Sequence, residues 1–228
     1  MYLKIANKNI LAYLWFAIEN DANILISGPR FNSKTLFLEA LCNFIPEDKS
    51  LMSIENFPEL TILRKEWKPY VTLQDEKEIK HLLGLRTDYI IYDNMFFGVP
   101  FVLHSFGARY NGIISIQTDD SAVERLEELG VHRSLIPNID IIVTMTIEKS
   151  KGKIAKRIKS IHEVLGYDFN NNSILLNKVF YWDRSIDRFL AYRSELIGKL
   201  AARNKMSIAA AKQDISKKIQ TLESSKEL

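Results

Sequence analysis

The sequence predicts an α/β fold in which helices cover a mostly parallel central sheet. Two observations favour this fold. Short apolar runs of strand length recur along the chain, and segments with apolar residues at helical spacing lie between them. Since parallel neighbouring strands need a crossover between them, usually a helix, this alternation is typical of a parallel sheet with helices on its faces.

The predicted elements follow one another in a regular order. Apolar residues at helical spacing up to Asn20 predict an amphipathic helix that leads into the core. A short apolar run then ends at Gly28, and a polar loop separates it from a second amphipathic helix. We expect strands over 22–27, 51–54, 89–92, 113–116 and 139–143, and helices over 35–44 and 121–129.

The pattern changes beyond Met145, where a basic stretch leads into strand and hairpin material with an asparagine-rich turn. From Tyr192 onward the sequence predicts two helices, the second capped by Ser207. We therefore divide the chain into a core over 1–148 and a small C-terminal extension of hairpin and helices over 149–228.

Composition and charge exclude several classes of protein. The 228 residues are 46% hydrophobic, which is enough to bury one good-sized core. The net charge of +3 is too small to demand a nucleic acid as partner. Cys42 is the single cysteine, so no internal disulfide forms, as in a reducing cytosol. Neither a secretory leader nor an apolar run of roughly 20 residues is present, so we expect a cytoplasmic protein without a transmembrane segment.

One loop carries a nearly complete phosphate-binding pattern. In such loops, backbone N–H groups and the following helix N-terminus surround the phosphates, Lys34 would reach the β and γ phosphates, and Thr35 would hold Mg²⁺. Arg30 could add a phosphate contact, and the alternative is a plain surface turn before an amphipathic helix. The pattern G-x-x-x-x-G-K-[ST] is matched, except at its second glycine, by Gly28, Pro29, Arg30, Phe31, Asn32, Ser33, Lys34 and Thr35.

Further segments resemble the motor ATPases of type II and type IV secretion, type IV pili and archaella. The run S-I-E-N-F-P-E-L around Glu55 is similar to that family's acidic box, I-E-D-x-x-E-[LI]. The run L-G-L-R-T-D-Y-I-I-Y-D-N that ends at Asn94 resembles its L-R-x-R-P-D-x-I-I-x-G-E segment, and R-S-L-I-P at 133–137 resembles a later signature.

The resemblance covers almost the whole chain and fits the archaellum and archaeal pilus branch most closely. It implies a RecA-like P-loop NTPase core with ATP and Mg²⁺ as cofactors. It also implies that the large N-terminal domain of the family is absent, because the chain starts about one helix before the phosphate loop.

The resemblance breaks down at catalytic positions. The family's glutamate after the second motif corresponds to Asn94, the histidine of its S-T-x-H-A box to Gln117, and the histidine of its T-G-H turn to Tyr110. Phosphoryl transfer depends on positioning metal, water and charge around the γ phosphate, so these losses predict slow hydrolysis or none.

Other functional residues are retained. Glu55 stands where the acidic box supplies a carboxylate that polarises the attacking water. Asp93 follows an apolar strand, as the Mg²⁺-associated aspartate of many P-loop proteins does, and would hold the metal with Thr35. Arg86 matches one arginine of the family's second motif. The alternatives are a strand-end turn residue for Asp93 and a solvated charge for Arg86.

These observations leave three functional hypotheses. The favoured one is an ATP-binding protein that hydrolyses ATP weakly or not at all and associates with a full-length motor ATPase and a membrane platform protein. The second is an active ATPase that powers pilus, archaellum or secretion assembly as a homo-oligomeric ring. Both place the chain in the cytoplasm, at times on the inner face of the membrane. The third, a nucleic-acid-handling protein using the basic stretch over 149–159, is disfavoured because charge runs usually form solvated faces.

Overall fold

A central sheet runs through the whole molecule in the computed structural model, which describes residues 5–72, 75–94, 96–108, 110–150 and 153–224. The helices are α1 (Lys8–Glu19), α2 (Lys34–Cys42), α3 (Glu76–Leu82), α4 (Val99–Ala108), α5 (Ala122–Glu128), α6 (Leu196–Arg203) and α7 (Ile208–Ser224), with a 3₁₀ helix η1 (Arg133–Asn138). The strands are β1 (Ile24–Gly28), β2 (Leu51–Glu55), β3 (Trp67–Val71), β4 (Tyr89–Asp93), β5 (Asn111–Gln117), β6 (Ile141–Ser150), β7 (Lys153–Asp168), β8 (Ser173–Asp183) and β9 (Arg188–Ala191).

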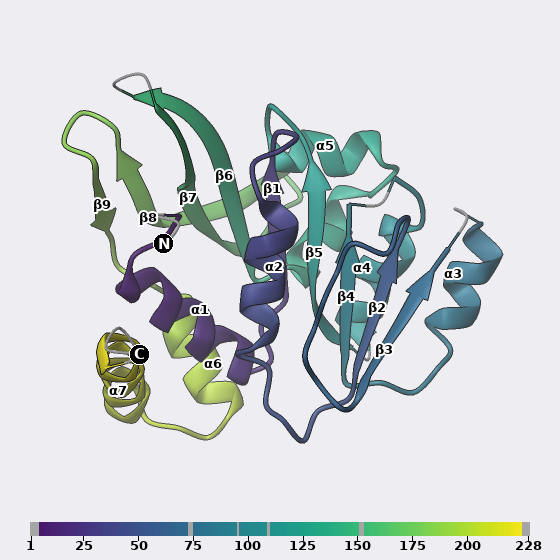
Figure 1. Ribbon diagram of the computed structural model, residues 1–228, viewed down its shortest axis with the longest axis horizontal. Coiled ribbons are helices and arrows are strands. Elements are labelled where there is room, and N and C mark those ends of the chain that lie inside the picture. The colour runs from purple at the N-terminus through teal and green to yellow at the C-terminus, as the bar shows by residue number, and fades with distance from the viewer. Residues whose placement is uncertain (1–4, 73–74, 95, 109, 151–152, 225–228) are drawn as a thin grey trace.

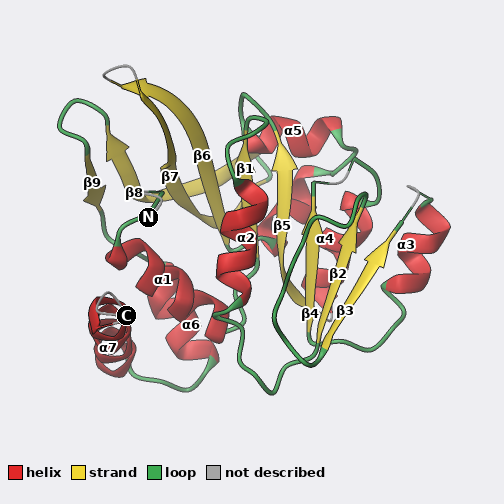
Figure 2. Ribbon diagram, viewed as in Figure 1, coloured by secondary structure: helices red, strands yellow, loops and turns green. Residues whose placement is uncertain are grey.

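The described strands form one sheet in the order β3-β2-β4-β5-β1-β6-β7-β8-β9. The strands from β3 to β6 pair in parallel, and those from β6 to β9 pair antiparallel. The predicted mostly parallel α/β fold is thereby confirmed. The strand β6 crosses residue 148, so the sheet continues without a break from the core into the C-terminal extension (Figure 2).

Helices cover both faces of the sheet (Figure 1). One apolar cluster joins the sheet to α1, α2, α6 and α7, and a second joins the opposite face to α3, α4, α5 and η1. The strands β1, β2 and β4 are buried along their whole length, as expected of parallel strands covered on both sides.

The predicted strands and helices are all present, with bounds that shift by a few residues in most cases and by seven at the end of β6. Ser207 caps α7 as expected, because its Oγ accepts from the Ala210 N–H at 3.1 Å. The basic stretch over 149–159 belongs to the end of β6 and the start of β7, apart from 151–152, which lie outside the described residues. Among the residues the structure covers, no helix is long and apolar enough to cross a membrane.

A buried carboxylate ties the extension to the first helix. Glu163 of β7 is fully buried, and its Oε1 accepts from the Tyr13 hydroxyl at 2.9 Å and from the Ser194 hydroxyl. Its Oε2 accepts from Asn177 Nδ2 and from the Glu195 N–H, both at 2.9 Å. One side chain therefore links α1, β7, β8 and the segment that enters α6.

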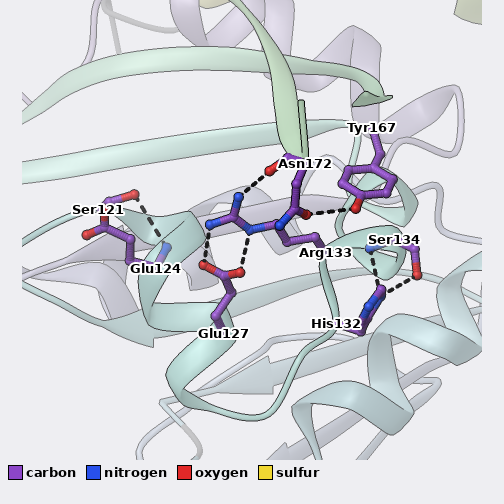
Figure 3. A network of polar contacts seen from close by, with 8 residues as sticks. All are labelled: Ser121, Glu124, Glu127, His132, Arg133, Ser134, Tyr167 and Asn172. Atoms are coloured by element: carbon purple, nitrogen blue, oxygen red, sulfur yellow. Dashed lines mark hydrogen bonds and ion pairs between the residues drawn. The ribbon is translucent and has the colours of Figure 1, made fainter. Parts of the chain in front are cut away.

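A polar network between α5, η1 and the hairpin holds the turn between β7 and β8 (Figure 3). Arg133 of η1 forms an ion pair with Glu127 of α5, with Nη2 and Oε2 2.9 Å apart, and donates to the Asn172 carbonyl. The Tyr167 hydroxyl donates to Asn172 Oδ1 at 2.7 Å. The hairpin tip is therefore attached to the core by side chains as well as by the sheet.

Candidate functional site

The candidate site lies where the parallel strands end. The phosphate loop connects Gly28, the last residue of β1, to Lys34, the first residue of α2. In the strand register, Glu55 of β2 pairs with Asp93 of β4, and Gln117 of β5 pairs with Gly28. Because parallel strands present their carboxyl ends at one edge, four separate segments meet beside the loop, at the usual position of ligand sites in open α/β sheets.

Two non-glycine residues of the loop have backbone conformations that glycine favours. Phe31 and Ser33 have φ values of 61° and 68°, in the left-handed region that side chains disfavour. Turns that contain residues in this conformation can direct neighbouring N–H groups to one side and form a concave anion-binding surface. Ser33, which stands at the position of the second glycine, is therefore strained but does not prevent the loop from forming.

Lys34 is enclosed by the loop that precedes it. Its Nζ donates to the Pro29 and Gly28 carbonyl oxygens at 2.8 and 3.0 Å and lies 3.4 Å from Asn32 Oδ1. Burial lowers the pKa of Lys34 to about 8, while nearby Asp93 and Asp119 act in the opposite direction. The ammonium is thus held at the centre of the loop and is easier to deprotonate than an ordinary lysine.

The Asn32 side chain is buried and contacts Lys34 of the same loop. Its Oδ1 accepts from the Lys34 N–H at 3.2 Å as well as facing the Lys34 ammonium. This orientation of the amide is the one that avoids placing a donor against two donors. Its Nδ2 is buried with no hydrogen-bond partner among the described residues. The amide oxygen therefore occupies donors that a bound anion would use.

We predict that Asn32→Ala strengthens anion binding by the loop. Removing the amide frees the backbone and side-chain donors of Lys34, and a hydrogen bond of about 1 kcal/mol corresponds to a gain of roughly fivefold in affinity. Titration calorimetry with inorganic pyrophosphate measures it, with Asn43→Ala at the far end of α2 as the matched control. Weaker binding by Asn32→Ala would instead make the amide part of the anion site, as expected from the sequence.

Thr35 and Asp93 meet beside Lys34, as the sequence predicts for a metal site. The Thr35 hydroxyl donates to Asp93 Oδ2 at 2.9 Å, and the Ser115 hydroxyl of β5 donates to Asp93 Oδ1. Asp93 is almost fully buried. A hydroxyl and one carboxylate suit Mg²⁺, which is usually held by one or two carboxylates together with substrate phosphates and water. The oxygen ligands present therefore fit the metal.

Glu55 lies at the same edge, but its carboxylate is already occupied. Its Oε2 accepts from the Glu59 and Leu60 N–H groups at 2.9 and 2.8 Å, and its Oε1 accepts from the Ser53 hydroxyl at 3.1 Å. Burial raises the pKa of Glu55, while these hydrogen bonds oppose the rise. In this conformation the carboxylate stabilises the turn after β2.

Asn94 and Gln117 lie near the loop but carry no ionisable group. Asn94 has a φ of 50°, its N–H donates to the Ser115 carbonyl oxygen, and its carbonyl accepts from Asn56 Nδ2 at 3.1 Å. Gln117 Oε1 accepts from Arg30 Nε at 3.2 Å. This contact holds the guanidinium of Arg30 beside the loop.

Arg86 is not brought to this site. It precedes β4, whose carboxyl end carries Asp93, so it lies at the opposite edge of the sheet. There it is exposed and borders a recess with Ser50, Asp88 and Tyr110. Within this chain, Arg86 therefore lies away from the phosphate loop.

Sequence reasoning missed three residues that lie near the loop. Ser115 holds Asp93, Asp119 acts electrostatically on Lys34, and Lys156 of β7 donates to the Ser33 hydroxyl at 2.9 Å. A cavity of about 330 Å³ lies between the loop, the end of β5 and the strands β6 and β7. Only the position of Ser115, as a polar residue within the apolar run of a buried strand, could have drawn attention to it.

Comparison with known proteins gives distant sequence relatives. No protein-family model matches the chain. It is 29% identical over 197 residues to the uncharacterized protein MJ1287 of Methanocaldococcus jannaschii. This match covers 79% of this chain and 72% of that protein. It is 23% identical over 177 residues to the type IV secretion system protein VirB11 of Bartonella quintana, and this match covers 66% of this chain. The chain spans half the length of that VirB11 protein.

Solved structures show the same fold. The VirB11 ATPase of Brucella suis matches with a TM-score of 0.59 at 16% identity, over 68% of this chain and 52% of that chain. The ATPase DotB of Legionella pneumophila matches with a TM-score of 0.52 at 8% identity, over 96% of this chain and 57% of that chain. The chain is a distant homologue of the VirB11 proteins of type IV secretion systems and shares the RecA-like fold of the solved VirB11 and DotB ATPases.

Proposed function

We propose that the chain binds ATP with Mg²⁺ at the loop over 28–35 and hydrolyses it slowly or not at all. The observation that carries the proposal is the arrangement around Lys34. The loop that encloses it contains two residues with left-handed backbone conformations, and the contact between Thr35 and Asp93 lies beside it. The crystal structure of the Brucella suis VirB11 ATPase is a complex with sulphate, and a tetrahedral oxyanion is also the ligand that such a loop suits.

Each part of the site has a role in this proposal. Backbone N–H groups of the loop and the N-terminus of α2 surround the phosphates, and Lys34 neutralises their charge. Thr35 and Asp93 would hold Mg²⁺, which would offset negative charge on the phosphates when bound. Arg30, held by Gln117, lies where it can add a further phosphate contact.

Slow turnover is supported by the residues that would have to activate water. Glu55 Oε2 accepts two hydrogen bonds from the turn that follows β2, Oε1 accepts one from Ser53 of β2, and Asn94 offers a neutral amide rather than a carboxylate. A base that is occupied or uncharged cannot readily take a proton, so chemistry should be slower than binding allows. An active motor ATPase remains the alternative, supported by the retained Asp93 and Thr35.

Partners and domain roles are also proposals. A ring of identical subunits, a full-length motor ATPase and a membrane platform protein follow from the resemblance, and the chain spans only part of the curated relatives. We further propose that residues 149–228 act as an extension of the same ATPase module, since β6 and β7 lie beside the phosphate loop.

An Mg-ATP binding isotherm on the whole chain beside Lys34→Ala tests the proposal. We expect binding by the wild type and loss of binding in the variant, because the loop then lacks its central ammonium. Lys199→Ala on α6 is the matched control for removing one positive charge. Absence of binding in the wild type would refute the proposal, and turnover at ordinary ATPase rates would refute its catalytic part.

The pH dependence of binding should follow the pKa of Lys34. With that pKa lowered to about 8, the free protein loses the ammonium proton as pH rises through this value. Binding that needs the charged form should be constant below it and weaken by up to about tenfold per pH unit above it. Isotherms from about pH 6.5 to about pH 9.5 measure the bend. Lys34→Arg stays charged over this range and should show no bend.

A further inference from the structure

The strand β7 brings a second lysine to the phosphate loop. Lys156 Nζ donates to the Ser33 hydroxyl at 2.9 Å, across 123 positions of sequence. Ser33 is the residue directly before Lys34, and its φ of 68° lies in the left-handed region. Lys156 is half-buried, so its ammonium is held at the rim of the loop.

The shape of the β6–β7 hairpin positions this strand. Met145 pairs with Ile158 and Thr144 with Ser160, so Lys159 is an extra residue in β7 and marks a bulge. Bulges bend a strand and redirect its side chains. The Met145 carbonyl lies against Gly28, which fixes the hairpin directly beside the loop.

The hydrogen bond to Ser33 uses only one of the three donors of the Lys156 ammonium. An ammonium has three donors and prefers an anionic acceptor, whereas the Ser33 hydroxyl is neutral and takes only one. Among the described residues, no carboxylate lies within ion-pair distance of Lys156. Lys34, by comparison, directs its ammonium at three oxygens of the loop.

Charge balance around the loop favours a second cation. Asp93 and Asp119 act on Lys34, so the loop's one buried ammonium already faces two carboxylates. A bound triphosphate would add further negative charge to these two carboxylates, and one magnesium ion, Lys34 and Arg30 together do not neutralise all of it. An ammonium at the rim would offset this excess.

We propose that Lys156 is a second phosphate-binding lysine, which reaches the phosphates of a nucleotide in the loop from β7 of the same chain. This inference rests on the proposed function. It assigns the β6–β7 hairpin a direct part in binding.

Isotherms of Mg-ATP and of inorganic pyrophosphate test the inference. Lys156→Ala should weaken both about tenfold, as expected for one charge-assisted contact. Lys156→Gln, which keeps the length but not the charge, should weaken them nearly as much and guards against misfolding of the alanine variant. Lys178→Ala on β8 removes an exposed lysine from the next strand and should change binding less than twofold. No loss in either Lys156 variant would overturn the inference.

A double-mutant cycle with Ser33→Gly separates direct contact from support of the loop. If Lys156 contacts the phosphates, the tenfold loss persists when the Ser33 hydroxyl is removed. A loss that disappears in the Ser33→Gly background would mean that Lys156 acts only through that hydroxyl, and the inference would fail while nucleotide binding stands. If neither the wild type nor Lys34→Ala binds, the proposed function fails together with the inference.

Discussion

Gly28→Ala is expected to destabilise the protein by roughly 3 kcal/mol and to abolish ligand binding at the loop. Gly28 has a φ of 152°, a conformation that side chains rarely adopt. A Cβ there would lie 2.5 Å from the Met145 carbonyl oxygen and 2.3 Å from Asn32 Nδ2. The first neighbour is backbone in the paired strand β6 and cannot yield without separating β1 from β6. Chemical denaturation and a pyrophosphate isotherm measure the two effects.

Gly198→Ala is the matched control for this substitution. Gly198 lies in α6, and a Cβ there meets nothing within 4 Å. The change should stabilise the helix by about 0.5–1 kcal/mol and leave binding unaltered. Combining Gly28→Ala with Asn32→Ala removes one of the two close contacts and should recover only part of the stability. Wild-type stability in Gly28→Ala would show that β6 does not pack against the loop as described.

The meeting of the site residues could be predicted from the sequence because it depends on local patterns. Gly28, Glu55, Asp93 and Gln117 each end an apolar run of strand length. Carboxyl ends of parallel strands share one edge, so their proximity follows once the strands are recognised. The same rule explains why Arg86, at the amino end of its strand, lies elsewhere.

The strand β3 and the helix α4 are among the elements that were not predicted, because tertiary context overrides their local signals. The strand β3 contains Pro69, which is compatible only with an edge strand, and β3 is indeed at the edge of the sheet. The helix α4 carries apolar residues on more than one side and includes Pro100 and Gly107, which indicate a loop. Proline is tolerated there because it lies in the first turn.

The contacts between distant segments could not be read from the sequence. The hydrogen bond between Lys156 and Ser33 joins segments 123 positions apart, near a bulge in β7 that no local pattern indicates. The folding of the Asn32 amide back onto Lys34 depends on loop conformation. A loop motif identifies the kind of ligand, whereas packing decides which donors are free to bind it.

Glu163→Leu is expected to destabilise the protein by about 4 kcal/mol, because the variant leaves four donors without their acceptor. The Tyr13 and Ser194 hydroxyls, Asn177 Nδ2 and the Glu195 N–H all donate to this carboxylate. Each buried unpaired donor costs roughly 1–3 kcal/mol, and the two hydroxyls can recover part of this by rotating toward other acceptors. For a chain of this size, the melting temperature should fall by about 8–16 °C.

Glu163→Gln separates hydrogen bonding from packing at this position. The glutamine oxygen can accept from Asn177 and the Glu195 N–H, while its NH₂ group faces hydroxyls that can turn to accept, so the loss should be below about 2 kcal/mol. Glu148→Gln, which alters the surface ion pair with Arg184, is the control and should change stability by less than about 0.5 kcal/mol. Equal losses in Glu163→Leu and Glu163→Gln would mean that the negative charge matters more than the hydrogen bonds. If neither variant lost stability, the attachment of α6 and β8 to the first helix would have to come from the apolar cluster alone.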